Sequence, residues 1–152
     1  MAETLGSLCD KLTVVKLKQF HSNDTERLKS LETQEKQLQE EINEFVTAAV
    51  SGRIRVDRLT FAANKVFKKY GNIVSRVTGT IGDVFSKLVE VNCALWHEQE
   101  KVYDFEKVPA EDKNTVVKHL ALLNLERTQC IDQIDNQFRA LIEKVPNADS
   151  KI

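Results

Sequence analysis

Two histidines of this 152-residue chain are each followed three residues later by a carboxylate. His21 precedes Asp24, and His97 precedes Glu100. Residues at i and i+3 share one face of a helix, and imidazole with carboxylate can bind a divalent cation. The Glu-x-x-His pattern of di-iron helical bundles is absent at both histidines. We therefore expect no metal centre and no cofactor. If the fold brings the two pairs together, these four residues are the candidate metal ligands.

The cysteines offer a second kind of chemistry. Cys93 and His97 are spaced at i and i+4, which suits a shared metal ion or a thiolate–imidazolium pair. No third partner accompanies them, so the expected role of Cys93 is packing. The other two cysteines, Cys9 and Cys130, are also flanked by apolar residues, and this pattern is typical of buried thiols in the reducing cytosol. Because the sequence holds no complete catalytic constellation, we expect a protein that is not an enzyme.

An arginine interrupts the most C-terminal apolar pattern. Arg127 lies between Leu123 and Ile131, on a helix face that should be dry, and a buried guanidinium needs an acidic partner. One interpretation pairs Arg127 with Glu35 in a structural network. The alternative is a polar pocket of a metal-assisted enzyme or of a protein that binds an anionic or sugar-like ligand. The lining of that pocket would be Trp96, His97, Glu100, Asn124 and Arg127.

Composition limits the class of protein that must position these residues. Hydrophobic residues make up 41% of the chain and charged residues 30%, with five Gly and two Pro, which predicts one all-α domain over residues 1–152. The net charge of −1 gives no global attraction to nucleic acid or anionic lipid. No export signal begins the chain and no apolar run is long enough to cross a bilayer, so we expect a cytoplasmic protein without membrane contact.

Apolar spacing and helix-breaking residues predict five helices. Hydrophobic residues recur at intervals of three and four between breaks at residues 22–24, 51–52, 78–82 and 108–109. The expected helices cover residues 5–21, 25–51, 53–80, 82–105 and 109–145. The second of them carries the clearest stripe, which only Glu35 interrupts, and its heptad-like spacing favours association with a second copy. The stripe consists of Leu28, Leu31, Leu38, Ile42, Phe45 and Ala49.

Charge is segregated along the chain. Residues 53–76 carry seven basic residues and one acid, whereas residues 22–51 carry seven acids and three basic residues. The basic segment also contains Phe61, Phe67 and Tyr70, which are able to stack on bases. It has no nucleic-acid-binding motif, so the expected use of these charges is mutual neutralisation within the protein or across a dimer.

The two halves of the chain show a repeat. Residues 11–21 and 87–97 both contain K-L-x-x-V followed five residues later by an aromatic residue and then His, at a constant offset of 76. Residues 31–42 match residues 123–134 at an offset of 92. Since a single helical hairpin cannot bury both faces of its helices, the repeat predicts two related hairpins packed against each other.

The expected fold is therefore an all-α, five-helix bundle built from two pseudo-repeated hairpins. The first hairpin covers residues of about 3–51 and the second about 82–145. The basic helix over about 53–80 is the connector between them.

Three sequence runs also resemble a known family. They are LWHEQE at residues 95–100, LNLERT at residues 123–128 and ID-x-ID at residues 131–135. This pattern resembles a small bacterial all-helical domain family of unknown function over roughly residues 84–142, and residues 10–18 resemble the opening of another such family. The resemblance implies a bacterial intracellular protein and no particular reaction.

Together these patterns predict a cytoplasmic interaction or assembly module without catalysis of its own. The expected partner is a second copy of the chain or another protein, and not nucleic acid. The alternative is a small-molecule-binding or metal-assisted enzyme that uses the polar group around Trp96 and Arg127.

Overall fold

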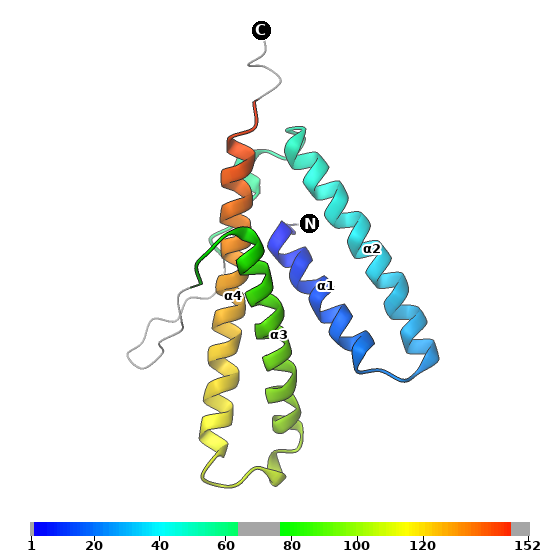
Figure 1. Cartoon of the computed structure of the whole chain (residues 1–152), viewed down its shortest axis with the longest axis vertical. Coiled ribbons are helices and arrows are strands. Elements are labelled where there is room, and N and C mark those ends of the chain that lie inside the picture. The colour runs from blue at the N-terminus through cyan, green and yellow to red at the C-terminus, as the bar shows by residue number, and fades with distance from the viewer. Residues whose placement is uncertain (1, 64–76, 147–152) are drawn as a thin grey trace. The chain divides into compact units, whose positions relative to one another are not determined.

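The computed structural model describes residues 2–63 and 77–146, and within these ranges the chain forms four α-helices and no strand. The helices are α1 (Leu5–Phe20), α2 (Thr25–Val50), α3 (Ile81–Tyr103) and α4 (Lys113–Glu143), with short 3₁₀ turns at η1 (Val56–Arg58) and η2 (Phe105–Lys107). Figure 1 shows this order along the chain. The predicted all-α class is confirmed.

The predicted connector helix is not formed in its described part. Residues 53–63 are irregular except for η1, and residues 64–76 lie outside the described residues. The backbone turns away from α2 at Gly52, which has a positive φ of 77°, and the N–H of Ile54 donates to the carbonyl of Ala48 at 3.1 Å. Arg55 then pairs locally with Asp57 instead of continuing a helical face. The five-helix count is therefore not confirmed.

The chain divides into two compact units. Among the described residues, unit 1 consists of residues 2–62 and 131–146, and unit 2 of residues 63 and 77–130. Helix α4 contributes its first part to unit 2 and its last part to unit 1. The single domain expected over residues 1–152 stays a prediction.

In unit 1 the apolar stripe of α2 packs against α1. Leu8 and Val15 of α1 form a buried cluster with Leu31 and Leu38 of α2, and Leu12, Ile42 and Phe45 pack around it. Figure 1 shows the two helices side by side as a hairpin. The stripe thus has a use within the chain, and the dimer that its spacing suggested stays a prediction.

Glu35, the residue that interrupts this stripe, finds its partners on α1. Its Oε1 lies 2.9 Å from Nζ of Lys16, and its Oε2 accepts a hydrogen bond from Nε2 of Gln19 at 2.8 Å. The hydrogen bonds from Gln19 and Lys16 hold the pKa of Glu35 below its ordinary value. Both carboxylate oxygens are thus engaged inside the first hairpin. The expected pair of Glu35 with Arg127 joins residues of different units and stays a prediction.

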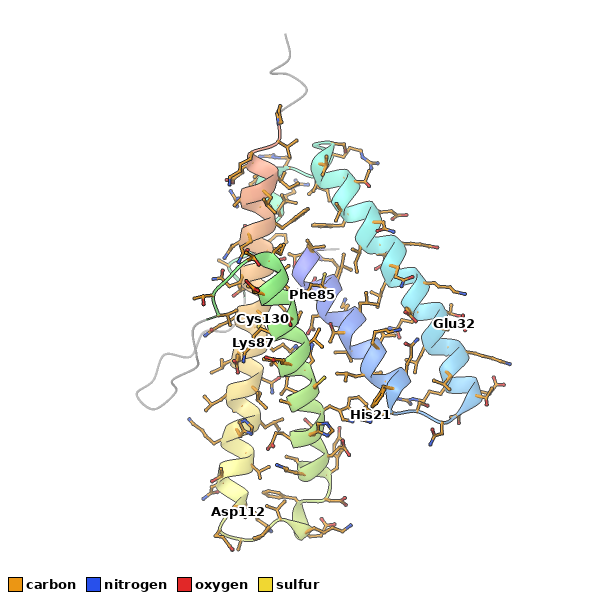
Figure 2. All side chains as sticks on the ribbon, viewed as in Figure 1. His21, Glu32, Phe85, Lys87, Asp112 and Cys130 are labelled. Atoms are coloured by element: carbon orange, nitrogen blue, oxygen red, sulfur yellow. The ribbon has the colours of Figure 1, made fainter. Side chains whose placement is uncertain are left out.

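Unit 2 is a second hairpin, formed by α3 and the first part of α4. Val84, Leu88 and Val91 of α3 are at most 2% exposed, as the predicted stripe of this helix requires. Nζ of Lys87 lies 3.3 Å from Oε1 of Glu126 across the hairpin, and Figure 2 shows Lys87 on the side of α3 that faces α4. The hydrogen bond and charge of Glu126 raise the pKa of Lys87.

The predicted pseudo-repeat is not confirmed. His21 and His97 occupy equivalent positions in the sequence repeat, yet His21 follows the last residue of α1, whereas His97 lies inside α3. The difference arises because α1 stops at Phe20, before the N-cap Asp24 of the next helix, while α3 continues to Tyr103.

Candidate functional site

The predicted metal-binding pairs differ in their local geometry. Nδ1 of His97 lies 3.5 Å from Oε1 of Glu100 on one face of α3, as the i, i+3 spacing predicts. His21 and Asp24 do not share a helix face, because they flank the turn between α1 and α2, where Figure 2 shows His21 at the end of α1. The Asp24 carboxylate accepts from the backbone N–H of Arg27 as a helix cap.

The two histidine pairs also belong to different units. Within the described ranges, no three His, Cys, Asp or Glu side chains are grouped so that they are able to hold a metal ion.

The five residues of the expected polar pocket lie in unit 2 but at different depths. Trp96 and Arg127 are half-buried, whereas His97, Glu100 and Asn124 are exposed. Nδ2 of Asn124 donates to the carbonyl of Leu120 in its own helix at 3.2 Å. Arg127 is therefore less buried than its place on the apolar pattern predicts, and a pocket lined by all five residues stays a prediction.

A buried carboxylate that the sequence analysis missed lies next to this group. Glu98 is 7% exposed; its Oε1 accepts from Nζ of Lys101 at 2.7 Å, and its Oε2 lies 3.4 Å from Nδ1 of His119. Burial raises the pKa of Glu98, but the hydrogen bonds and charges of Lys101 and His119 outweigh burial, so the pKa lies below its ordinary value. Glu98 is thus an anion that aligns a histidine of the facing helix.

The Glu98–His119 pair borders an open cavity of about 600 Å³ at the turn between α3 and α4. Glu100 is the one member of the expected five among the residues that line this cavity. The apolar part of the lining comes from Val108, Pro109 and Val116. Figure 2 places Asp112, another lining residue, at the start of α4. The signal for Glu98 was present in the sequence, since it continues the spacing of Val84, Leu88 and Val91.

The Glu98 carboxylate leads to a prediction about acid stability. Its lowered pKa means that it stabilises the fold above the unfolded value of 4.5, and that this contribution is lost as the pH falls through the folded pKa. Glu98→Gln should lower the free energy of unfolding by about 1 kcal/mol at pH 7, since Lys101 and His119 are half-exposed. At pH 3 the two proteins should differ little in urea unfolding.

The matched control is Glu100→Gln, which changes an exposed carboxylate two residues away on the same helix. We expect it to shift the free energy of unfolding by less than about 0.5 kcal/mol at either pH. A deficit for Glu98→Gln that is equal at pH 7 and pH 3 would contradict the assigned ionisation.

The cysteines occupy packing positions. All three are free thiols, with Cys9 and Cys130 buried and Cys93 half-buried. Burial raises the pKa of Cys9 to about 11, and the charges of Asp135 and Asp10 add to the effect. A thiol with this pKa is a poor nucleophile at neutral pH.

Unit 1 contains a larger groove. Its volume is about 1070 Å³, and it lies between the start of α1, the second half of α2 and the irregular segment 53–61. The apolar side chains in its lining are Ala2, Leu8, Phe45, Ala48, Ile54 and Phe61. Phe61 is 44% exposed, and the ring of Phe45 packs on Phe138 with 6.1 Å between centroids. The groove is therefore an apolar surface supported by packed aromatic side chains.

Charges of opposite sign border this groove. Glu41 and Glu44 lie on the α2 side, and Arg53 and Arg58 come from the segment that follows α2. These arginines belong to the basic segment over residues 53–76. Arg55 of this segment pairs with Asp57, and its other basic residues, together with Phe67 and Tyr70, lie outside the described residues. Glu3, which precedes α1, is a third acid in the lining, so the groove carries both acidic and basic side chains.

Comparison with known proteins gives no match with a family model, a curated protein or a solved structure. The family resemblance drawn from residues 84–142 and 10–18 stays a prediction. Within the described ranges, none of the helices is both long and apolar enough to cross a membrane.

Proposed function

We propose that the chain is a protein-interaction module without catalysis of its own, and that it binds an amphipathic helix of a partner protein in the groove of unit 1. The observation that carries the proposal is the apolar lining of this groove between borders of opposite charge. Helical ligands are recognised in this way, with apolar anchors in a groove and charges beside it.

The lining defines the chemistry of the partner helix. Phe45 and Phe61 offer aromatic surface for apolar side chains at i, i+3 or i+4, and i+7 of the ligand. We expect basic side chains of the ligand to pair with Glu41 and Glu44 along one flank. Acidic side chains along its other flank would pair with Arg53 and Arg58. Opposite charges on the two flanks would fix the direction in which the helix lies.

The occupant we propose is a helix of another protein. A homodimer was expected from the stripe of α2, but this stripe packs against α1 of the same chain, so the support for a second copy is weaker than the support for a foreign helix. A cytoplasmic location agrees with the three free thiols, because disulfides are rare in that compartment.

A photo-crosslinking experiment tests the proposal. Phe61 is replaced by p-benzoylphenylalanine in the full chain, in cells that express it, and the linked peptide is identified by mass spectrometry. The matched control places the same residue at Phe20, which is 84% exposed and outside the groove. We expect a link specific to position 61, to an amphipathic helix with basic and acidic flanks. A link to a second copy of the chain, or equal labelling from both positions, would overturn the proposal.

A synthetic peptide with the linked sequence then gives a quantitative prediction. Phe61→Ser should weaken its binding at least tenfold, because an aromatic anchor of an interface typically contributes more than about 1.4 kcal/mol. Phe20→Ser should leave the affinity unchanged. Both positions are exposed, so both variants should keep the wild-type melting temperature, and fluorescence anisotropy is the measurement. Equal affinities for the two variants would contradict the proposed groove.

Small-molecule binding in unit 2 is the second candidate function. It is favoured by the position of the ionised Glu98 and its partner His119 at the edge of a cavity of about 600 Å³, a size typical of ligand pockets. The first proposal is preferred because the unit 1 groove offers a larger, more aromatic lining.

A further inference from the structure

One buried carboxylate of unit 1 contacts the first turn of α1. Asp135 of α4 is 5% exposed, and its Oδ1 accepts a hydrogen bond from the backbone N–H of Gly6 at 2.7 Å. The hydroxyl of Thr4, the N-cap of α1, also hydrogen-bonds to this carboxylate. The Gly6 N–H is one of the first-turn amides that have no partner within a helix, so Asp135 supplies a partner from 129 residues away.

The contact is close because position 6 has no side chain. A Cβ at Gly6 would lie 2.5 Å from the carbonyl oxygen of Ile131 and 2.9 Å from Oδ1 of Asp135. The backbone of α1 therefore rests directly on α4 at this point, and the Asp135 carboxylate is enclosed between the two helices.

The acidic residues near Asp135 do not favour its ionised form. On α1, Asp10 lies one turn after Gly6 and is 5% exposed. The charges of Asp135 and Asp10 both raise the pKa of the Cys9 thiol. On α4, Asp132 adds a like charge. Burial raises the pKa of Asp135 to about 6, and the hydrogen bonds from Gly6 and Thr4 offset burial only in part.

We propose that Asp135 is a proton-operated latch between α1 and α4: the neutral acid keeps the first turn of α1 docked, and ionisation loosens it. The neutral acid still accepts from the Gly6 N–H without the cost of a buried charge. The ionised form gains solvation when α1 moves away from α4. The latch changes state between mildly acidic and neutral pH.

The direction of the effect follows from the raised pKa. An acid with a folded pKa of about 6 and an unfolded value of 3.8 stabilises docking fully below 3.8, and this stabilisation is lost as the pH rises towards 6. Between pH 4.5 and 7.5 the opening equilibrium of the first turn should increase about 25-fold.

The latch has a consequence for the shape of unit 1. Ala2, Glu3 and Leu8, which precede or begin α1, line the groove described above. Opening of the first turn would move this wall of the groove. The latch itself needs no bound partner, so its test is independent of the proposed function.

Hydrogen exchange of the first-turn amides tests the latch. The reporter amides include that of Leu8, which donates to the carbonyl of Thr4, and the rates are corrected for intrinsic exchange at each pH. In the wild-type chain we expect opening to increase about 25-fold from pH 4.5 to 7.5. Asp135→Asn keeps an acceptor for the Gly6 N–H and should show nearly constant opening over this range.

Two further results decide the outcome. Asp132→Asn, which changes the neighbouring carboxylate on the same helix, should keep most of the pH dependence of the wild type, because it removes only the smallest of the causes that raise the pKa of Asp135. A wild-type profile that is flat would overturn the proposal even if Asp135→Asn failed to fold. An Asp135→Asn profile as steep as that of the wild type would overturn it as well, because another group would then control the opening.

Discussion

Replacing Gly6 by alanine is expected to destabilise the protein by about 3 kcal/mol. The added Cβ would lie 2.5 Å from the carbonyl oxygen of Ile131, and a backbone atom in a packed helix cannot move aside as a flexible side chain does. Relief of the clash requires α1 to shift, and the shift would also weaken the 2.7 Å hydrogen bond from Gly6 to Asp135. Helix propensity alone predicts the opposite sign, a gain of up to about 1 kcal/mol.

The control for this prediction is Gly82→Ala in the first turn of α3. The nearest atom that its Cβ would meet is Oγ1 of Thr80 at 4.0 Å, so the variant should be as stable as the wild type or slightly more stable. Urea unfolding of the two variants gives the comparison. If Gly6→Ala were as stable as Gly82→Ala, the first turn of α1 would not be seated on α4 as the structure has it.

Local signals made most helix ends predictable. The expected end near Ser51 and Gly52 agrees with the structure, and the expected start at residue 82 lies one residue after the observed start of α3 at Ile81. Gly52 adopts a positive φ, and Thr80 caps α3 through its side chain. These choices depend on neighbours within a few residues. Helix α4 begins at Lys113, four residues after the predicted start, since Pro109–Asp112 form a turn first.

The segment that joins the two hairpins was not predictable in the same way. Leu59 fits a helical spacing with later apolar residues, but in the structure it is fully buried within an irregular stretch. A tertiary contact follows at the next residue, where Thr60 accepts from Arg139 of α4 at 2.9 Å. The partner lies 79 residues away, so no pattern within the segment could reveal it.

The candidate sites depended still more on distant neighbours. Periodicity singled out Arg127 as a buried charge, whereas the structure buries Asp10, Glu98 and Asp135. The spacing of apolar residues shows which face of a helix points inward. It does not show which polar side chains on that face form hydrogen bonds or ion pairs. Asp135 is stable in its position because Gly6, at the other end of the chain, offers a backbone N–H without a side chain. The unit 1 groove likewise needs three segments that only the fold brings together.

Leu88 of α3 lies in the core of unit 2. Leu88→Ala should lower the free energy of unfolding by about 3 kcal/mol, because Leu88 is 0% exposed and its removal leaves a cavity in addition to the lost transfer free energy. This loss is a large part of the 5–15 kcal/mol that is usual for a domain. Urea denaturation followed by circular dichroism at 222 nm is a suitable measurement for an all-helical chain.

The adjacent Val89→Ala is the matched control. Val89 is 39% exposed on the same turn of α3, and alanine is the better helix former, so the change should alter stability by less than about 0.5 kcal/mol. The ratio of the two effects tests how α3 is rotated about its own axis. Successive residues of a helix are 100° apart, so a rotation by one residue would place Val89 where Leu88 lies in the core. Equal effects would mean that α3 does not present the face on which Val84, Leu88 and Val91 lie, and the position of Glu98 beside His119 would then be wrong as well.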